Sequence, residues 1–515
     1  MVAKISILVI FFAIMIAVGI YCKKQSTDVK GFVLGGRNVG PWLTAFAYGT
    51  SYFSAVIFVG YAGQFGWKFG VASTWIGLGN AFIGSLLAWV VLGRRTRLMT
   101  QHLNTSTMPE FFGKRYDSKA LKIVASLIVF VFLIPYTASL YNGLSRLFEM
   151  AFPGVDYSVC VIVMAILTGI YVIAGGYMAT AINDFIQGII MLVGIVAVIF
   201  AVLGKNGGFM ESLAGLASIE VAAVSETPGV FASFFGPDPL NLLFVVILTS
   251  LGTWGLPQMV QKFYAIKSEK DITKGTIIST AFAVVVAGGC YFLGGFGRLF
   301  SPELEANGLL PMKDFDSIVP TMLSGLGDIL IAVVIVLVLS ASMSTLSSLV
   351  LTSSSTLTLD LIKGNISKNM SEKKQVLIMR IFIVVFIVIS AYIALNKDKL
   401  SAIADMMGIS WGALAGAFLA PFLFGLYWKK TTKASCYASF IFGAGIMILN
   451  MLMRPAFPVI LQSPINCGVI AMLTGFIIVP VVSIISPKLK KDKVNHMFSC
   501  YDVQISTSAK KNLGN

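Results

Sequence analysis

Apolar stretches of about twenty residues recur along this chain, and each is ended by a short segment that is polar or rich in Gly and Pro. An α-helix of about that length crosses the hydrocarbon core of a bilayer. The pattern therefore predicts an all-α polytopic membrane protein without a soluble domain. We expect thirteen transmembrane helices, at residues 2–22, 43–63, 69–93, 120–148, 157–175, 178–203, 239–263, 274–297, 325–355, 376–395, 401–426, 434–453 and 466–486.

The basic residues predict how these helices are oriented. Lys and Arg concentrate on the cytoplasmic side of membrane proteins. With the N-terminus outside, 29 of the 38 Lys and Arg residues fall in inner segments, including the four at 262–274. We therefore expect a cytoplasmic-membrane protein with an outer N-terminus and a cytoplasmic C-terminus. The first stretch is expected to be a retained helix, because no A-x-A-type cleavage site follows it and its basic pair, Lys23 and Lys24, comes after it.

Two connections and the C-terminal tail stand outside this pattern. The segments 204–238 and 298–324 are the longest connections, contain Gly, Pro and acidic residues, and are expected on the outside with short surface helices. The tail after residue 487 is basic and polar, and we expect it to be mobile.

Composition narrows the function further. Hydrophobic residues make up 57% of the chain and charged residues 12%, about half the charged share of soluble proteins. Soluble enzymes, nucleic-acid binders and disordered scaffolds are thereby excluded, and the net charge of +15 is assigned to inner loops. Six cysteines without a CxxC pair, two histidines, and no H-E-x-x-H or Walker A sequence leave no basis for an enzyme.

Two of the predicted helices have interrupted middles. One reads Ala47-Tyr-Gly-Thr-Ser-Tyr-Phe-Ser54 and the other Thr249-Ser-Leu-Gly-Thr-Trp-Gly-Leu-Pro257. Opened backbone at membrane depth is tolerated only where it lines a cavity or the protein interior, although a Gly/Ser packing seam between straight helices would look similar. The two helices lie five apart, the spacing that indicates an inverted-repeat transporter.

The ninth predicted helix carries twelve Ser or Thr residues between Ser340 and Thr358. Ala341, Ser344, Thr345 and Ser348 share one helical face. Uncharged hydroxyl oxygens suit a hard monovalent cation. Small-residue packing, with the hydroxyls bonded back onto their own helix, is the alternative.

Asp184 lies near the start of the sixth predicted helix. A carboxylate inside the membrane is a candidate for function, whereas one at the interface would be an ordinary N-terminal helix charge. Asp360 is expected to follow the ninth helix at its inner end.

The chain resembles the sodium:solute symporter family, nearest the bacterial sodium/proline and sodium/pantothenate symporters. The motifs that carry the resemblance are Phe32-Val-Leu-Gly-Gly-Arg37, Tyr171-Val-Ile-Ala-Gly-Gly176 with Asn183-Asp184-Phe-Ile-Gln187, and Met343-Ser-Thr-Leu-Ser-Ser348 with Thr358-Leu-Asp360. The resemblance implies a leucine-transporter-type fold with a five-plus-five inverted repeat. The expected divisions are an extra N-terminal helix and inner loop at 1–42, a ten-helix transport core at 43–426, two extra helices at 427–486 and a basic cytoplasmic tail at 487–515.

The resemblance also implies sodium sites. A first sodium ion would bind the carbonyls of Thr50, Phe53 and Ala341 and the hydroxyls of Ser344 and Thr345. A second would bind Asp184, Ser347 and Ser348 and share Ser344. One or two coupling sodium ions are therefore expected, and no catalytic residue.

The solute is expected beside the interrupted segments, where transporters of this kind bind substrate. Tyr52 stands where the proline symporters carry an aspartate, and Thr253 where they carry a tyrosine, whereas Gly255-Leu-Pro257 resembles the pantothenate type. Ordinary aromatic packing is the alternative for the aromatic members. The candidate solute-binding residues are Tyr52, Ser54, Tyr136, Thr253, Trp254 and Gln258.

These observations predict sodium-coupled symport of a small organic solute into the cell by alternating access. The solute would be an amino acid such as proline or a small carboxylate such as pantothenate. The expected partners are this solute and membrane lipid, with no nucleic acid and no obligatory protein partner. A proton-coupled symporter of the same fold and a channel or receptor on this scaffold are the alternatives, although hydroxyl ligands do not titrate and no channel filter is present.

Overall fold

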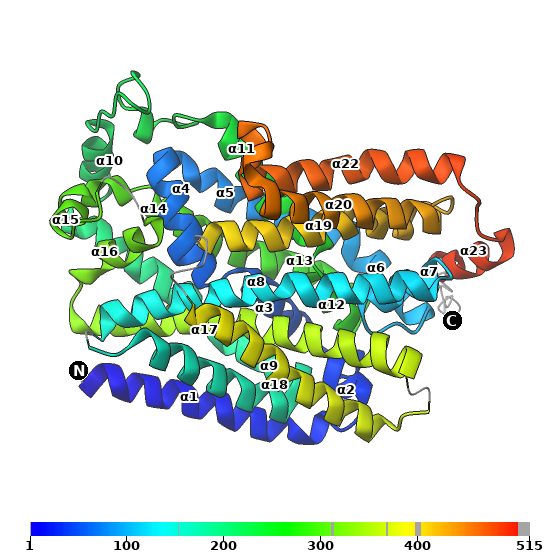
Figure 1. Ribbon diagram of the computed structural model, residues 1–515. Coiled ribbons are helices and arrows are strands. Elements are labelled where there is room, and N and C mark those ends of the chain that lie inside the picture. Colours follow the sequence, from blue (N-terminus) through cyan, green and yellow to red (C-terminus); the bar gives the residue numbers. More distant parts are fainter. Residues whose placement is uncertain (1, 153, 311–313, 367–368, 397–402, 503–515) are drawn as a thin grey trace, which may run out of the picture.

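The structure is a computed structural model that describes residues 2–152, 154–310, 314–366, 369–396 and 403–502. Within this described part the chain is helical, with isolated β-bridges and no β-strand. Figure 1 shows most of the long helices running side by side between two ends of the molecule. One end, here called the α10 end, holds α10 (Phe209–Ala217), α15 (Ser301–Ala306) and α16 (Ile318–Ser324); the opposite α23 end holds α2 (Val29–Leu34), α7 (Met108–Arg115) and α23 (Lys491–Phe498).

Ten helices in the described part are long and apolar enough to cross a membrane, or eleven if a bent pair forms one span. Two of them, Val56–His102 and Tyr157–Lys205, are longer than one crossing needs and each reaches over two of the predicted helices. A glycine with positive φ lies inside each, Gly70 (φ 62°) and Gly176 (φ 57°). The total of thirteen transmembrane helices stays a prediction.

The remaining long helices are α1 (Val2–Cys22), α8 (Lys119–Ala151), α13 (Glu269–Ala283) with α14 (Gly289–Gly294), α17 (Asp328–Thr356), α18 (Glu372–Leu395), α19 (Ile403–Tyr427), α20 (Lys433–Met453) and α22 (Pro464–Ile485).

Both interrupted segments are breaks in the structure, as the sequence predicts. The first lies between α3 (Pro41–Tyr52) and the π-helix η3 (Val56–Tyr61), which continues into α4 (Ala62–Phe69). The second lies between α11 (Pro239–Leu251) with η8 (Gly252–Gly255) and α12 (Pro257–Ala265), whose axes differ by 47°. Leu256 is extended at φ −85° and ψ 121°, because a residue before proline disfavours the helical region.

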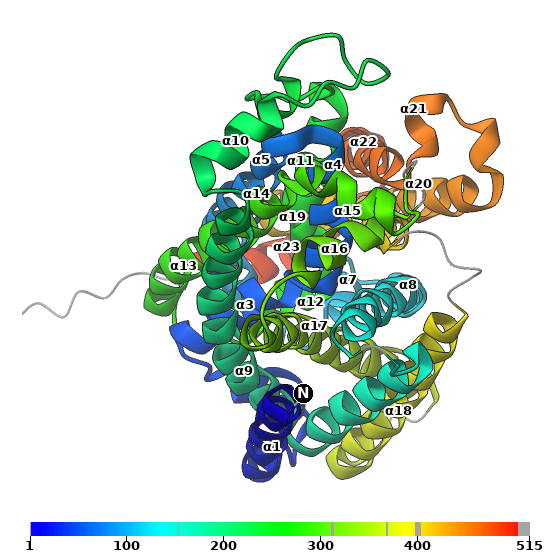
Figure 2. The same ribbon diagram turned by 90° about the vertical axis from the view of Figure 1, so that its left-hand side faces the viewer.

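The hydroxyl-rich helix α17 runs through the interior of the bundle. Every residue from Val334 to Thr356 is buried. Figure 2 shows α1 and α18 at one edge of the bundle and α20 and α22 at the opposite edge, with α17 and α19 between them. Since this part of α17 is buried on all sides, its hydroxyl groups need partners within the protein.

The structure corrects two of the sequence predictions about helix ends. The ninth helix does not stop before Asp360, because α17 continues as the π-helix η12 (Leu357–Ile366), and the Asp360 side chain is fully buried there, 2.6 Å from the Thr107 hydroxyl. The start of the tail, expected to be mobile, forms α23 instead, and Lys493 of α23 pairs with Asp117 at 2.6 Å. The two longest connections do form short helices, as predicted.

Candidate cation and solute sites

The end of α3 presents backbone carbonyls that lack helical partners. α3 stops at Tyr52, and Phe53 is extended at φ −89° and ψ 117°. The last carbonyls of a helix receive no N–H from a following turn. The carbonyls of Thr50 and Phe53 therefore need donors from elsewhere, and in the membrane interior water cannot supply them.

Two hydroxyls of α17 fill this need. The Ser344 hydroxyl donates to the carbonyl of Thr50 at 3.0 Å or to that of Ala341, also at 3.0 Å. The Thr345 hydroxyl oxygen lies 3.2 Å from the Thr50 carbonyl, 3.4 Å from that of Phe53 and 3.1 Å from that of Ala341. All five residues predicted for the first sodium site are thus brought together, and all five are buried.

This cluster of five oxygens, here called the α3–α17 cluster, fits a monovalent cation. It combines three carbonyl oxygens and two hydroxyl oxygens and carries no formal charge. Each hydroxyl also holds two lone pairs, so rotation of its hydrogen presents an acceptor to a cation. Hard cations prefer such oxygen ligands. The residues present are therefore able to hold Na⁺.

Neighbouring hydroxyls of α17 support the rest of the break. The Ser342 hydroxyl accepts the backbone N–H of Ala55 at 3.3 Å, and the hydroxyl oxygens of Ser348 and Ser51 lie 2.9 Å apart. Other hydroxyls bond back onto their own helix, as in Ser347, which donates to the Ser344 carbonyl at 2.9 Å. The hydroxyls of α17 therefore bond both to their own helix and to the first break, and cation binding by this face stays a prediction.

The residues predicted for a second sodium ion come together only in part. Asp184 is fully buried within α9 (Tyr157–Lys205). The Lys262 ammonium of α12 lies 3.9 Å from the Asp184 carboxylate and donates to Ser348 at 3.0 Å. The sequence predicts Lys262 at the inner end of the helix 239–263, among the inner basic residues; in the structure it is only 3% exposed. The sequence signal for this buried contact is a lysine shortly after the second break, and the sequence analysis missed it.

Three of the candidate solute-binding residues have buried polar atoms that make no hydrogen bond of normal geometry in the described part of the chain. These atoms are the hydroxyls of Ser54 and Tyr136 and both side-chain amide atoms of Gln258. Tyr136 packs edge-on against Trp411 of α19, with ring centroids 5.8 Å apart. A Cβ on Gly252, at the second break, would lie 3.8 Å from the Trp411 ring. Trp411 therefore contacts Tyr136 and lies beside the second break. The sequence analysis did not single it out, because its only sequence signal is an aromatic residue within a Gly-rich helix.

The other candidate residues are placed differently. The Thr253 hydroxyl lies 2.8 Å from the Ser250 carbonyl and 3.3 Å from that of Gly84, and the Trp254 indole donates to the Ile83 carbonyl at 3.0 Å. Their polar atoms are thus engaged by the protein itself. The Tyr52 side chain lies outside the described part of the structure.

Comparison with known proteins identifies the family. Residues 32–443 match the profile of the sodium:solute symporter family. The chain belongs to this family. It is therefore a multi-pass membrane transporter rather than an enzyme, and it couples the symport of a small solute to Na⁺.

Two curated relatives match this symporter over almost its whole length. The osmoregulated proline transporter OpuE of Bacillus subtilis strain 168 is 29% identical over 498 residues, which cover 96% of each chain. A sodium/proline symporter of Staphylococcus aureus strain JH9 is 31% identical over 503 residues, covering 94% of this chain and 92% of the relative.

Two solved structures share the fold of the symporter. A Na⁺-coupled sialic acid symporter in a substrate-bound, outward-open state has a TM-score of 0.72 at 18% identity and covers 95% of this chain and 99% of its own. A nucleobase-cation-symport-1 family transporter in a closed conformation has a TM-score of 0.50 at 15% identity, covering 92% of this chain and 98% of its own. The predicted fold class, an all-α polytopic protein of the leucine-transporter type, is confirmed.

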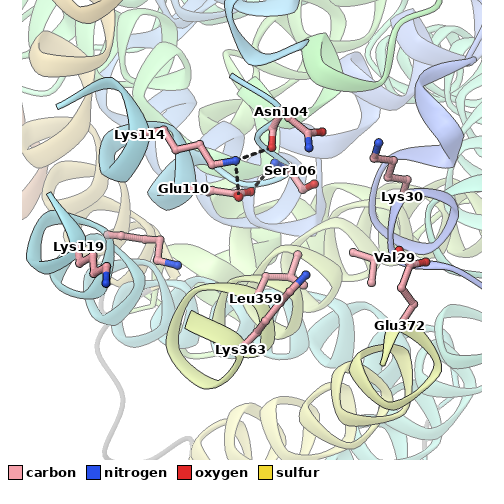
Figure 3. A pocket seen from close by; sticks show the side chains of 11 residues that line it. Val29, Lys30, Asn104, Ser106, Glu110, Lys114, Lys119, Leu359, Lys363 and Glu372 are labelled. Atoms are coloured by element: carbon pink, nitrogen blue, oxygen red, sulfur yellow. Dashed lines mark hydrogen bonds and ion pairs between the residues drawn. The ribbon is translucent and has the colours of Figure 1, made fainter. Parts of the chain in front are cut away.

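The symporter has a pocket at each end of the bundle. The pocket at the α10 end measures about 1140 Å³, and Gln64, Lys68, Asp405 and Arg454 are among its lining residues. The pocket at the α23 end measures about 710 Å³. Figure 3 shows this second pocket, where side chains from segments far apart in the sequence meet. Its lining is rich in lysine, namely Lys30, Lys114, Lys119, Lys122 and Lys363, with Glu110 and Glu372 as the acidic members.

Proposed function

We propose that this symporter carries a small solute with a carboxylate group into the cell together with Na⁺, and that proline is the first candidate. The proline transporters that match the chain at 29% and 31% identity support this choice. A small carboxylate such as pantothenate is the second candidate, because Tyr52 and Thr253 depart from the proline pattern.

The α3–α17 cluster is the observation that carries the proposal. Na⁺ would bind the carbonyls of Thr50, Phe53 and Ala341 and the hydroxyls of Ser344 and Thr345. These groups come from two helices, so a cation between them holds the end of α3 against α17. Ser54 and Ala55 follow the Phe53 carbonyl directly, so ordering this break also orders the neighbouring solute site. Linkage then requires that solute raise sodium affinity by the same factor.

The solute would bind beside the two breaks. The unpaired groups of Ser54, Tyr136 and Gln258 supply hydrogen bonds, and the Trp254 ring is a candidate wall. We include two further residues in this site: Tyr52 at the first break and Thr253 at the second. Aromatic walls with a few polar groups are typical of sites for small organic solutes.

The proposed orientation places the N-terminus outside and the C-terminus in the cytoplasm. The lysine-lined pocket at the α23 end supports it, because cytoplasmic segments are enriched in Lys and Arg. In this orientation, residues 43–426 form the ten-helix inverted-repeat core, and the solute site opens alternately to the pocket at one end and to the pocket at the other. Residues 1–42, the two helices at 427–486 and the tail at 487–515 flank it. The surrounding partner of this bundle is membrane lipid.

The test is uptake of radiolabelled proline by proteoliposomes that contain the purified protein. Accumulation is expected only with an inward sodium gradient, and unlabelled amino acids and pantothenate added in excess rank the solutes by competition. Equal accumulation without a sodium gradient would overturn sodium coupling. A proton gradient that replaces the sodium gradient completely would favour the proton-coupled alternative.

A further inference from the structure

The buried lysine Lys262 joins the two broken helices through Ser348. Lys262 belongs to α12, after the second break, and its ammonium donates to the Ser348 hydroxyl at 3.0 Å. The Ser348 oxygen in turn lies 2.9 Å from that of Ser51, just before the first break. The ammonium also lies over the Tyr177 ring, 5.2 Å from its centroid.

The charge balance around Lys262 involves one carboxylate. The carboxylate of Asp184 is fully buried and lies 3.9 Å from the ammonium. Neither carboxylate oxygen has a hydrogen-bond partner in the described part of the chain. A buried charge is stable only when it is paired, so Lys262 and Asp184 compensate one another.

The ammonium thus occupies the surroundings that the sequence predicts for a second sodium ion. Asp184 and Ser348 are two of the four residues of that set, and both already face Lys262. An ammonium group has three hydrogen-bond donors and no acceptor, so it satisfies oxygen atoms but cannot ligate a metal ion. A sodium ion placed beside it would add a second positive charge to a site with a single carboxylate. The residues present do not fit a second sodium ion while Lys262 stays in this position.

We propose that the Lys262 ammonium serves as a tethered second cation, so that one sodium ion, not two, binds to this symporter. The proposal rests on the sodium-coupled function proposed above. Lys262 moves with α12 and is never released, so it holds Asp184 and Ser348 to the second broken helix throughout transport. The only cation that exchanges with solution is then the one in the α3–α17 cluster.

The experiment counts radioactive sodium ions bound per molecule of purified protein at saturation, without any solute. One ion is expected for the wild type. Lys262→Met removes the ammonium and leaves Asp184 without its partner, and two bound ions are expected for this variant. Lys262→Arg retains a tethered cation and should bind one ion. The double variant Lys262→Met with Asp184→Asn lacks both charges and should also bind one.

Two results would overturn the proposal. They are two sodium ions bound to the wild type and a single ion bound to a folded Lys262→Met variant. The wild-type count decides the question even if Lys262→Met does not fold. Absence of any saturable sodium binding would instead contradict the proposed sodium-coupled function, so the two failures are distinguishable.

Discussion

The hydroxyl oxygen of Thr345 lies 3.2 Å from the carbonyl of Thr50 and so joins α17 to the end of α3, where that helix breaks. The two residues are 295 positions apart in the sequence. A helix end that lacks water must find its hydrogen-bond donors in another helix. The same oxygen atoms that stabilise the break therefore form a site for a cation.

Thr345→Ala removes one oxygen from this site and should weaken sodium binding. Hydrogen bonds and contacts to charged groups contribute about 1.5–3 kcal/mol, so the sodium concentration for half-maximal uptake should rise about tenfold or more. Sodium titration of proline uptake in proteoliposomes measures this half-maximal sodium concentration.

Thr345→Ser keeps the hydroxyl, and its half-maximal sodium concentration should stay near that of the wild type. Ser354→Ala is the matched control, because Ser354 donates to the Leu351 carbonyl of its own helix; an unchanged sodium dependence in Thr345→Ala would remove this assignment.

Tyr136→Phe should weaken solute binding without destabilising the fold. The Tyr136 hydroxyl is buried, faces the Ser54 hydroxyl and the Trp411 indole, and makes no hydrogen bond of normal geometry in the described residues, so its removal breaks no well-formed protein hydrogen bond. The loss of one hydrogen bond to solute should raise the half-saturating proline concentration about two- to tenfold.

The control for Tyr136→Phe is Tyr116→Phe. The Tyr116 hydroxyl donates to the Pro421 carbonyl at 2.6 Å. This second variant should lower the melting temperature and leave the half-saturating proline concentration unchanged. If Tyr136→Phe behaves like Tyr116→Phe, the hydroxyl of Tyr136 is structural and does not contact solute.

Gly176→Ala should destabilise the protein. Gly176 has φ 57° inside α9, and an added Cβ would come within 2.8 Å of Phe32 in α2. With ψ at −147°, this is a backbone region that essentially only glycine adopts, and it costs a residue with a Cβ about 1–3 kcal/mol. Gly204→Ala is the control in the same helix, because nothing lies within 4 Å of its added Cβ. Thermal unfolding in detergent should show a lower melting temperature for Gly176→Ala alone, and equal melting temperatures would contradict the argument.

Asp316→Asn should change how stability depends on pH. Asp316 lies in the short helix η11 (Phe315–Ser317), outside the long apolar helices, and burial raises the pKa of its carboxyl to about 6. An unfolded aspartate has a pKa of about 3.9. The folded state therefore holds a proton that the unfolded state has lost, so this stabilising contribution is complete below about pH 4 and is lost as the pH rises through 6.

The measurement compares melting temperatures of the wild type and Asp316→Asn between about pH 4 and pH 7. The wild type should lose more stability than the variant over this range, by up to ~3 kcal/mol for a shift of about two pKa units. Parallel pH profiles would show that Asp316 does not carry the expected proton.

The two breaks and the hydroxyl-rich face of α17 were predictable from the sequence because local chemistry encodes them, whereas the five ligands of the first sodium site follow from the family resemblance and stay a prediction. Gly and hydroxyl residues at Gly49–Ser51 and Gly252–Gly255 weaken a helix locally, and the repeat at i, i+3, i+4 in α17 places Ala341, Ser344 and Thr345 on one face. These signals lie within single segments, and the structure needs only to bring the two segments together.

Other features depend on where a side chain reaches, which the sequence pattern does not encode. Lys262 follows a break and counts as an inner basic residue at the end of its predicted helix, yet its long side chain extends to Asp184. Trp254 lies in the predicted solute segment, but its indole turns to the Ile83 carbonyl. Asp360 was placed beyond its helix because the sequence gives no sign that η12 continues α17.

Sodium binding to the purified Ser344→Ala/Thr345→Ala double variant tests the central claim most directly. Both side-chain oxygens of the α3–α17 cluster are then absent, while the Lys262–Asp184 pair is untouched. The account predicts saturable binding of radioactive sodium to the wild type and its loss, or at least about a hundredfold weakening, in a double variant that still folds, with a lower melting temperature because carbonyls at the end of α3 lose their donors. Wild-type sodium affinity in a folded double variant would contradict the account.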